Sequence, residues 1–187
     1  PGASDPQVVY MQAFDPSAQP SGPATLLAIP SDQVPQGVPQ VVADGTGQFD
    51  VAWLSTSSTF QTTLWLQRFD AGGVAEGGPI DALGSTFSTP NPAVQETYLG
   101  IAADAVGDIT LMWGVGGVSA GSTITTGTIN AQRLDANNNL LGSPIVVTSS
   151  AAPVNPAIAE DPAGDFEIAW WQYASGQYSL MVQAYDP

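Results

Sequence analysis

The strongest constraint on the fold is a motif that occurs three times with constant internal spacing. Its copies occupy residues 41–53, 101–113 and 158–170, and each ends on a tryptophan: Trp53, Trp113 or Trp170. In each copy an Asp lies nine positions before the Trp, and a Gly follows three positions after that Asp. Apolar alternation on both sides of an Asp/Gly turn predicts two antiparallel strands. The chain is therefore predicted to be a β-repeat protein.

Two further strands complete each unit. A third strand is expected at 64–70, 129–135 and 180–186, with another copy at 9–15. A Gly stands seven residues after the final Asp of this strand where the chain continues, and a last apolar strand follows at 24–29, 79–83 and 144–147. We name the four strands of a unit A, B, C and D. The order C-D, A-B-C-D, A-B-C-D, A-B-C gives thirteen strands and essentially no helix, because no long segment has a 3.6-residue apolar period.

These strands predict an all-β chain in one domain, residues 1–187, with units at approximately 1–34, 35–89, 90–150 and 151–187. Prolines such as Pro39, Pro153 and Pro156 are expected before strands or between units, where a missing backbone N–H costs nothing. Four-stranded units of roughly 50–60 residues are typical of β-propeller blades. The chain is incomplete at both ends by this count, since it holds about three blade equivalents.

Loop lengths differ between the two edges of the predicted sheets. The A–B and C–D spacings are constant, whereas the Trp-to-Gln spacing across the B–C loop is 14, 19 and 13 residues. From the D-strand Gly to the next A-strand Asp the spacing is 22, 27 and 19 residues. In a four-strand meander all of this variation falls on one edge. A constant scaffold with variable loops is a common arrangement for binding, although unconstrained surface loops also vary in length.

The motif Pro-x-Val/Ile-Ala-x-Asp-x-x-Gly-x-Phe-x-Val/Ile-Ala-Trp, followed by Gln-Arg-Phe-Asp and a Gly, resembles tandem repeats of secreted bacterial surface and adhesin-like proteins. It is also similar in outline to NHL-type propeller blades. The resemblance covers residues 7–187 and implies a β-propeller-like array of four-stranded antiparallel blades, without implying an activity. The sequence departs from the pattern at Leu99, where the other units have Pro, and at Ala13 and Ala184, which replace the Arg of the C strand.

Composition excludes several functions. Seventeen acidic residues, two Arg and no Lys or His give a formal net charge of −15, which argues against nucleic-acid partners. No apolar run approaches the roughly 20 residues of a membrane span. Without His, Cys or Lys, the chain has no Ser-His-Asp triad, no thiol nucleophile, no Schiff-base lysine and no zinc site built from His or Cys. The chain is predicted not to be an enzyme; an acidic glycoside hydrolase, which needs only two carboxylates, is the distant alternative.

Two kinds of side chain are candidates for ligand sites. The acidic turns place Asp104 with Asp108 and Asp161 with Asp165; each first Asp is expected to cap its own turn, so no cofactor is predicted, with calcium as the alternative. The tryptophans that end the B strands are expected to pack between units with their indole N–H groups bonded to carbonyls. Aromatic residues near the variable edge are the candidates for contact with a sugar: Trp171, Tyr173 and Tyr178.

The unmatched ends provide the main functional indication. A terminal C-D pair and a terminal A-B-C triple leave exposed strand edges, which attract further strands. We expect an assembly edge at Tyr10 and Met11 and at Leu180, Met181 and Val182. The sequence thus predicts a non-catalytic, extracellular or cell-surface structural or adhesive module that binds copies of itself or neighbouring repeats, head to tail, in a filament or surface layer. The alternative is a carbohydrate-binding propeller.

Overall fold

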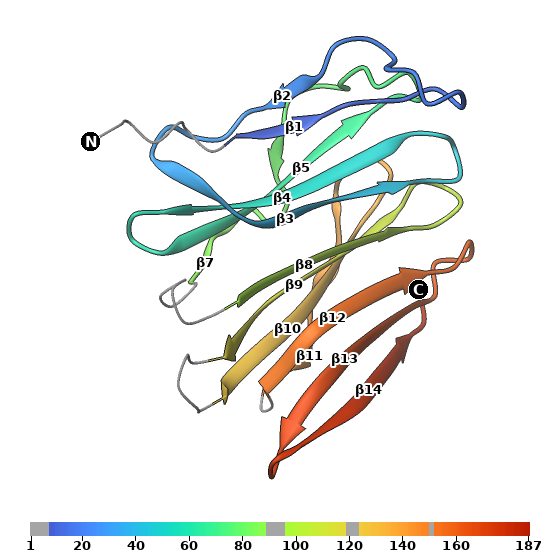
Figure 1. Ribbon diagram of the computed structural model, residues 1–187. Coiled ribbons are helices and arrows are strands. Elements are labelled where there is room, and N and C mark those ends of the chain that lie inside the picture. The colour runs from blue at the N-terminus through green and yellow to red at the C-terminus, as the bar shows by residue number, and fades with distance from the viewer. Residues whose placement is uncertain (1–7, 89–95, 119–123, 150–151) are drawn as a thin grey trace.

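The computed structural model describes residues 8–88, 96–118, 124–149 and 152–187, and these residues form strands and turns without a helix (Figure 1). No helix that could cross a membrane is therefore present in the described ranges. The strands are β1 (Val9–Met11), β2 (Thr25–Leu27), β3 (Gln33–Ala43), β4 (Phe49–Ser57), β5 (Gln61–Phe69), β6 (Ile80–Asp81), β7 (Phe87–Ser88), β8 (Glu96–Ala103), β9 (Ile109–Val118), β10 (Ile124–Leu134), β11 (Leu140–Thr148), β12 (Ala152–Glu160), β13 (Phe166–Ala174) and β14 (Gln177–Tyr185).

The strands form four antiparallel sheets that follow the expected A-B-C-D order. The N-terminal pair is β1–β2, sheet 1 is β3-β4-β5 with β6 and β7 both paired to β5, sheet 2 is β8-β9-β10-β11, and sheet 3 is β12-β13-β14. The described residues form fourteen strands, one more than the thirteen predicted. The D strand of sheet 1 is split into β6, beside Trp65 and Leu66, and β7, beside Gln61 and Thr62.

The A strands contain proline, contrary to the expectation that Pro lies outside strands. Pro39 lies in β3, and Pro153 and Pro156 lie in β12. Both strands are at the edge of their sheets, and their pairing with the B strand is interrupted by register shifts at Gln36/Gln40 and Val154/Ala157. β8, which has Leu99 in place of the Pro, pairs with β9 without a shift. Edge strands tolerate Pro because one row of their backbone N–H groups makes no ladder bond, and a bulge accommodates the rest.

The sheets stack face to face, and the core lies between them. Trp113 is buried between sheets 1 and 2, Trp170 between sheets 2 and 3, and Trp53 between sheet 1 and the N-terminal pair. The expected packing of these tryptophans between units is confirmed. The expected hydrogen bond is not, because the indole nitrogens of Trp53 and Trp170 have no partner among the described residues. Burial of the ring area, rather than a polar contact, places these side chains.

The constant turns gather at one edge of the stack, on the right in Figure 1. In each A–B turn the Asp carboxylate accepts backbone N–H groups of its own turn: Asp44 from Thr46 and Gln48, Asp104 from Val106, Gly107 and Asp108, and Asp161 from Ala163 and Asp165. The Gly takes positive φ, for example +92° at Gly107, which a side chain would disfavour. At the variable edge, residues 89–95, 119–123 and 150–151 lie outside the described ranges.

Candidate functional site

The first candidate surface is the open edge and outer face of sheet 3. No described strand pairs with the second edge of β14, and every residue of β14 except Tyr185 is exposed. The expected assembly residues Leu180, Met181 and Val182 lie here, with exposed fractions of 59%, 36% and 56%. An apolar strand that is open along its backbone donors and acceptors favours pairing with another strand.

The repeat shows what covers this face elsewhere in the chain. Leu180 and Val182 of sheet 3 occupy the positions of Leu64 and Leu66 in sheet 1 and of Ile129 and Ala131 in sheet 2. The four residues of sheets 1 and 2 are at most 1% exposed, because the next sheet packs on them. The outer face of sheet 3 therefore has the chemistry of an interior interface without a sheet on top of it.

The aromatic candidates gather on the same face. Tyr173 and Tyr178 are directly paired across β13 and β14, with ring centroids 4.9 Å apart at a tilt of 57°. Trp171 and Tyr178 line a shallow hollow of about 370 Å³ together with Val154 and Asn155. The structure thus brings the three aromatic residues predicted from the sequence into one patch, with the amide side chain of Asn155 beside it.

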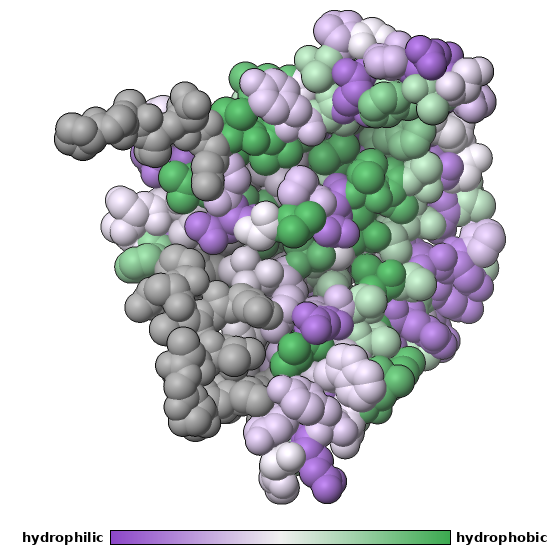
Figure 2. Space-filling model, viewed as in Figure 1, coloured by the Kyte–Doolittle hydropathy of each residue, from purple (hydrophilic) through white to green (hydrophobic). Residues whose placement is uncertain are grey.

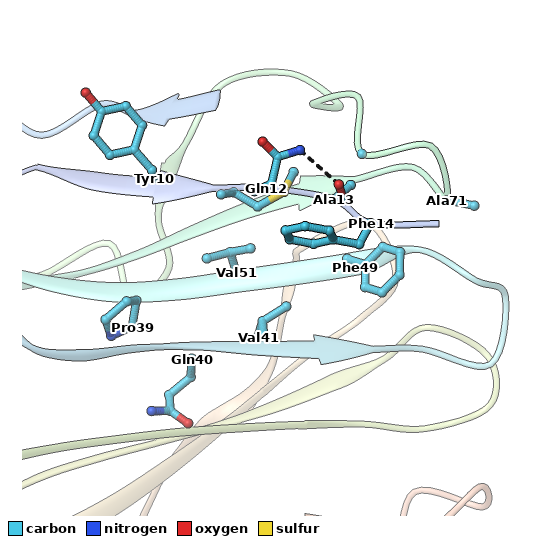
Figure 3. Close-up of a pocket in the computed structure, with 12 residues that line it drawn as sticks. Tyr10, Gln12, Ala13, Phe14, Pro39, Gln40, Val41, Phe49, Val51 and Ala71 are labelled. Carbon is cyan, nitrogen blue, oxygen red and sulfur yellow. Dashed lines mark hydrogen bonds between the residues drawn. The ribbon is translucent and has the colours of Figure 1, made fainter. Parts of the chain in front are cut away.

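The second candidate surface is a groove at the opposite end of the stack. It has a volume of about 370 Å³ and runs between β1 and the β3–β4 part of sheet 1. In Figure 3 the side chains of Phe14, Phe49, Val51 and Val41 extend into the space between these strands. Tyr10 and Met11, the other expected assembly residues, line the same groove. Figure 2 shows hydrophobic atoms gathered in this region of the surface.

The groove exists because the N-terminal pair covers only part of sheet 1. Val9 and Leu27 of this pair pack on Val51, Trp53 and Phe69, while Val41 on the A strand stays 64% exposed. Sequence analysis did not identify Phe14, Val41, Phe49 or Val51 as site residues. The signal that could have identified three of them is the repeat itself, because Val41, Phe49 and Val51 hold the positions of Ile101, Ile109 and Leu111 in the next unit.

In the acidic turns, three of the candidate metal residues accept backbone N–H groups through their carboxylates. One carboxylate oxygen of Asp104 and one of Asp161 accept hydrogen bonds from backbone N–H groups of their own turns. A carboxylate oxygen of Asp108 accepts the N–H of Ala136 at 2.9 Å. No group of three or more acidic side chains close enough to hold an ion occurs among the described residues. In the A–B turn of sheet 1, burial raises the pKa of Asp44, but hydrogen bonds from Thr46 and Gln48 hold it below its usual value. Asp44 thus caps its own turn as Asp104 and Asp161 do.

Arginine connects neighbouring sheets at the constant edge. Arg68 of β5 pairs with Asp50 of β4 and donates to the carbonyls of Gly107 and Ala136 in sheet 2. Arg133, at the same position in β10, has Thr110 where Asp50 stands, and its carboxylate partner is Glu160 of sheet 3 at 4.0 Å. Arg68 thus forms an ion pair within one sheet, and Arg133 forms one between two sheets.

Glu160 is the most perturbed of the described carboxyl groups. Its side chain is enclosed between sheets 2 and 3, and burial raises its pKa to about 7 against the hydrogen bond from Thr110 and the charge of Arg133. One of its oxygens has no hydrogen-bond partner among the described residues. Burial also raises the pKa of Asp50, against the hydrogen bonds and charge of Arg68, so both raised carboxyl groups belong to arginine ion pairs.

Neither a protein-family model nor a curated protein matches the sequence. Two open surfaces of the described residues are candidates for function, the outer face and edge of sheet 3 and the groove beside β1.

Proposed function

We propose that this chain is a non-catalytic structural or adhesive module of the extracellular or cell-surface type, built from β-propeller-like units that assemble head to tail through strand complementation. One observation carries the proposal. The last sheet exposes, at the repeat positions of Leu180 and Val182, apolar side chains that both preceding sheets bury against a neighbour.

The open edge of β14 supports a strand-addition mechanism. A strand that joins β14 would complete the A-B-C sheet as D strands complete sheets 1 and 2, and would satisfy a row of backbone groups. The β1–β2 pair of a second copy is a C-D pair that is not joined to A and B strands among the described residues, so its β2 is the complementary D strand. A contact between two different surfaces of one chain repeats from copy to copy and generates a ring or a filament.

The setting is proposed from composition. A chain with two Arg and no Lys has only two sites for trypsin-like proteases, and no His, Cys or Lys is available for the common catalytic constellations. A charge of −15 keeps copies apart in solution unless a specific contact overcomes the repulsion.

Light scattering with electron microscopy tests the proposal. The full chain should form particles larger than a monomer as its concentration rises, and deletion of residues 1–29 should leave monomers. Leu180→Asp should have the same effect without removing a segment. Val106→Asp is the matched control, because Val106 is 66% exposed on an A–B turn away from both surfaces. Full-chain monomers at all concentrations, or assembly unchanged in both variants, would contradict the proposal.

A carbohydrate-binding module is the second candidate, and the patch of Trp171, Tyr173 and Tyr178 favours it. Sugar rings stack on indole and phenol faces, and the Asn155 side chain could bond a hydroxyl. Trp171→Ala should abolish binding on a glycan array. Trp171→Leu separates the two functions, because Leu54 occupies the same repeat position in sheet 1 and is buried: assembly should persist while sugar binding is lost.

A further inference from the structure

We infer that the groove between β1 and β3–β4 is the receptor for the outer face of sheet 3 of a second copy, with Val41 of one copy against Ala157 of the other. The inference rests on the proposed head-to-tail assembly and names the surface that receives the exposed face. It follows from contacts that the chain makes twice in its interior.

The interior interfaces between sheets share one pattern. At the interface between sheets 1 and 2, the buried residues of sheet 1 include Ala52, Leu54, Leu64 and Leu66. Those of sheet 2 include Ile109, Leu111 and Trp113, and Ile101 packs beside them. In sheet 3 the positions of Ala52 and Leu54 are held by Ala169 and Trp171, and the face they belong to is open. In sheet 1 the positions of Ile101, Ile109 and Leu111 are held by Val41, Phe49 and Val51, and these three line the groove.

The A strands of sheets 2 and 3, β8 and β12, are in direct contact. Gly100 of β8 lies against Ile158 of β12, since a Cβ atom placed on Gly100 would be 2.9 Å from Ile158 Cγ2. Counted along the repeat, Ala157 has the position of Gly100, and Val41 has the position of Ile158. Sheet 3 stacked on sheet 1 of a second copy in the same way puts Ala157 next to Val41. Both residues are exposed within one chain.

The N-terminal pair leaves one part of sheet 1 uncovered. β1 and β2 are three residues long and cover the part of the sheet around Trp53 and Phe69. The open part lies over β3 and β4, where A and B strands of a preceding unit would lie. Sheet 3 supplies such strands as β12 and β13. Both copies bring a C strand to this layer. β1 is the C strand that gives way, because its three residues are far fewer than the nine of β14, and β2 then joins β14 as its D strand.

The junction between sheet 3 of one copy and sheet 1 of the next lacks two polar links that the interior interfaces have. In the interior, Arg68 and the N–H of Ala105 connect one sheet to the constant turns of the next. Sheet 3 has Ala184 and Pro162 at these two positions, and Pro162 has no N–H to donate. The N-terminal pair also has Ala13 where Arg68 stands. The junction is thus apolar, which makes it weaker than the interior interfaces and reversible with concentration.

Disulfide trapping tests the assignment, because the chain contains no Cys. Full chains that carry only Val41→Cys are mixed with full chains that carry only Ala157→Cys and are then oxidised. We expect a disulfide-linked heterodimer on a non-reducing gel, since the two Cβ atoms should approach the roughly 3.5–4.5 Å that a disulfide requires. Val106→Cys replaces Val41→Cys in the control and should give none. Use of singly substituted chains excludes a bond within one copy.

The outcomes separate this inference from the function it rests on. If light scattering shows assembly but the Val41/Ala157 mixture yields no more dimer than the control, the groove assignment is wrong and the assembly proposal stands. Preferred Val41/Val41 or Ala157/Ala157 bonds would indicate a two-fold contact and would also overturn the assignment. If the chain is monomeric at every concentration, the proposed function fails and the inference fails with it.

Discussion

Arg68 binds both carboxylate oxygens of Asp50, with Nε at 3.0 and 3.2 Å and Nη2 at 2.9 Å. Both side chains are buried, at 6% and 0% exposed. The same guanidinium donates to the carbonyls of Gly107 and Ala136, so one side chain joins two strands of sheet 1 to two turns of sheet 2. This cluster links the two sheets together with the hydrogen bond from the Gly45 N–H to the Asp104 carbonyl.

Arg68→Ala should lower the free energy of unfolding by about 3–5 kcal/mol, because it leaves the buried Asp50 carboxylate without a partner. Urea unfolding followed by tryptophan fluorescence measures the change. Replacing both residues, Arg68→Ala with Asp50→Ala, should recover part of the loss. A single variant that costs less than the double variant would contradict this account.

Stability should fall as pH rises through the titration of Glu160. The folded-state pKa is about 7, above the value of an unfolded Glu, so the protonated form is favoured by folding. This contribution is complete below roughly pH 4.5 and is lost as pH rises towards 7. Glu160→Gln should therefore have a higher Tm than wild type at pH 8. Its free energy of unfolding should be larger by on the order of 1 kcal/mol after solvent screening. At pH 4.5 the two melting temperatures should agree.

Gly164→Ala should destabilise the contact between sheets 2 and 3. Gly164 has φ of +94°, and a Cβ atom there would lie 3.0 Å from Arg133 Nη2 and 3.6 Å from Asp104 Oδ2. We expect a loss of more than the about 1–2 kcal/mol that the left-handed backbone alone costs. Gly176→Ala is the control, since it has φ of +84° with nothing within 4 Å. Equal losses in thermal unfolding would show that the inter-sheet contact contributes nothing.

Salt should promote assembly. Each copy carries a net charge of −15, and the proposed contact is apolar, so screening reduces repulsion without weakening the attraction. Light scattering at 20 mM and 500 mM NaCl, with pH fixed, should show a larger mean particle at high salt. Dissociation at high salt would indicate that ion pairs hold the copies together.

Removal of divalent ions should leave the fold unchanged. The carboxylates of Asp104 and Asp161 are engaged by backbone N–H groups of their own turns, which stabilise these turns without an ion. Melting curves in EDTA and in millimolar calcium should coincide. A rise in Tm with calcium, lost in Asp104→Asn, would instead establish an ion at the candidate turns.

The sequence was sufficient for the local structure. The nine-residue spacing from Asp to Trp determined two strands and a tight turn, and the repeat determined the A-B-C-D order, because these depend on alternation and on turn residues within a few positions. The split of the D strand into β6 and β7 was missed, since pairing to β5 at two separate points depends on the partner strand. Bulges at Pro39 and Pro156 were missed for the same reason, although Leu99 marked the one A strand that lacks them.

The equivalence of Ala52, Met112 and Ala169 could be written down from the sequence. Only the stack of sheets decided that the first two are buried and that the face of the third is open. Likewise, the sequence placed Arg68 and Arg133 at one repeat position, but the structure assigned Asp50 to one and Glu160 of the next sheet to the other. Alternation along a strand specifies two faces and cannot specify what lies across either of them. Contacts between sheets join residues far apart in the chain, so burial, ion pairing and the groove beside β1 were decided by tertiary packing.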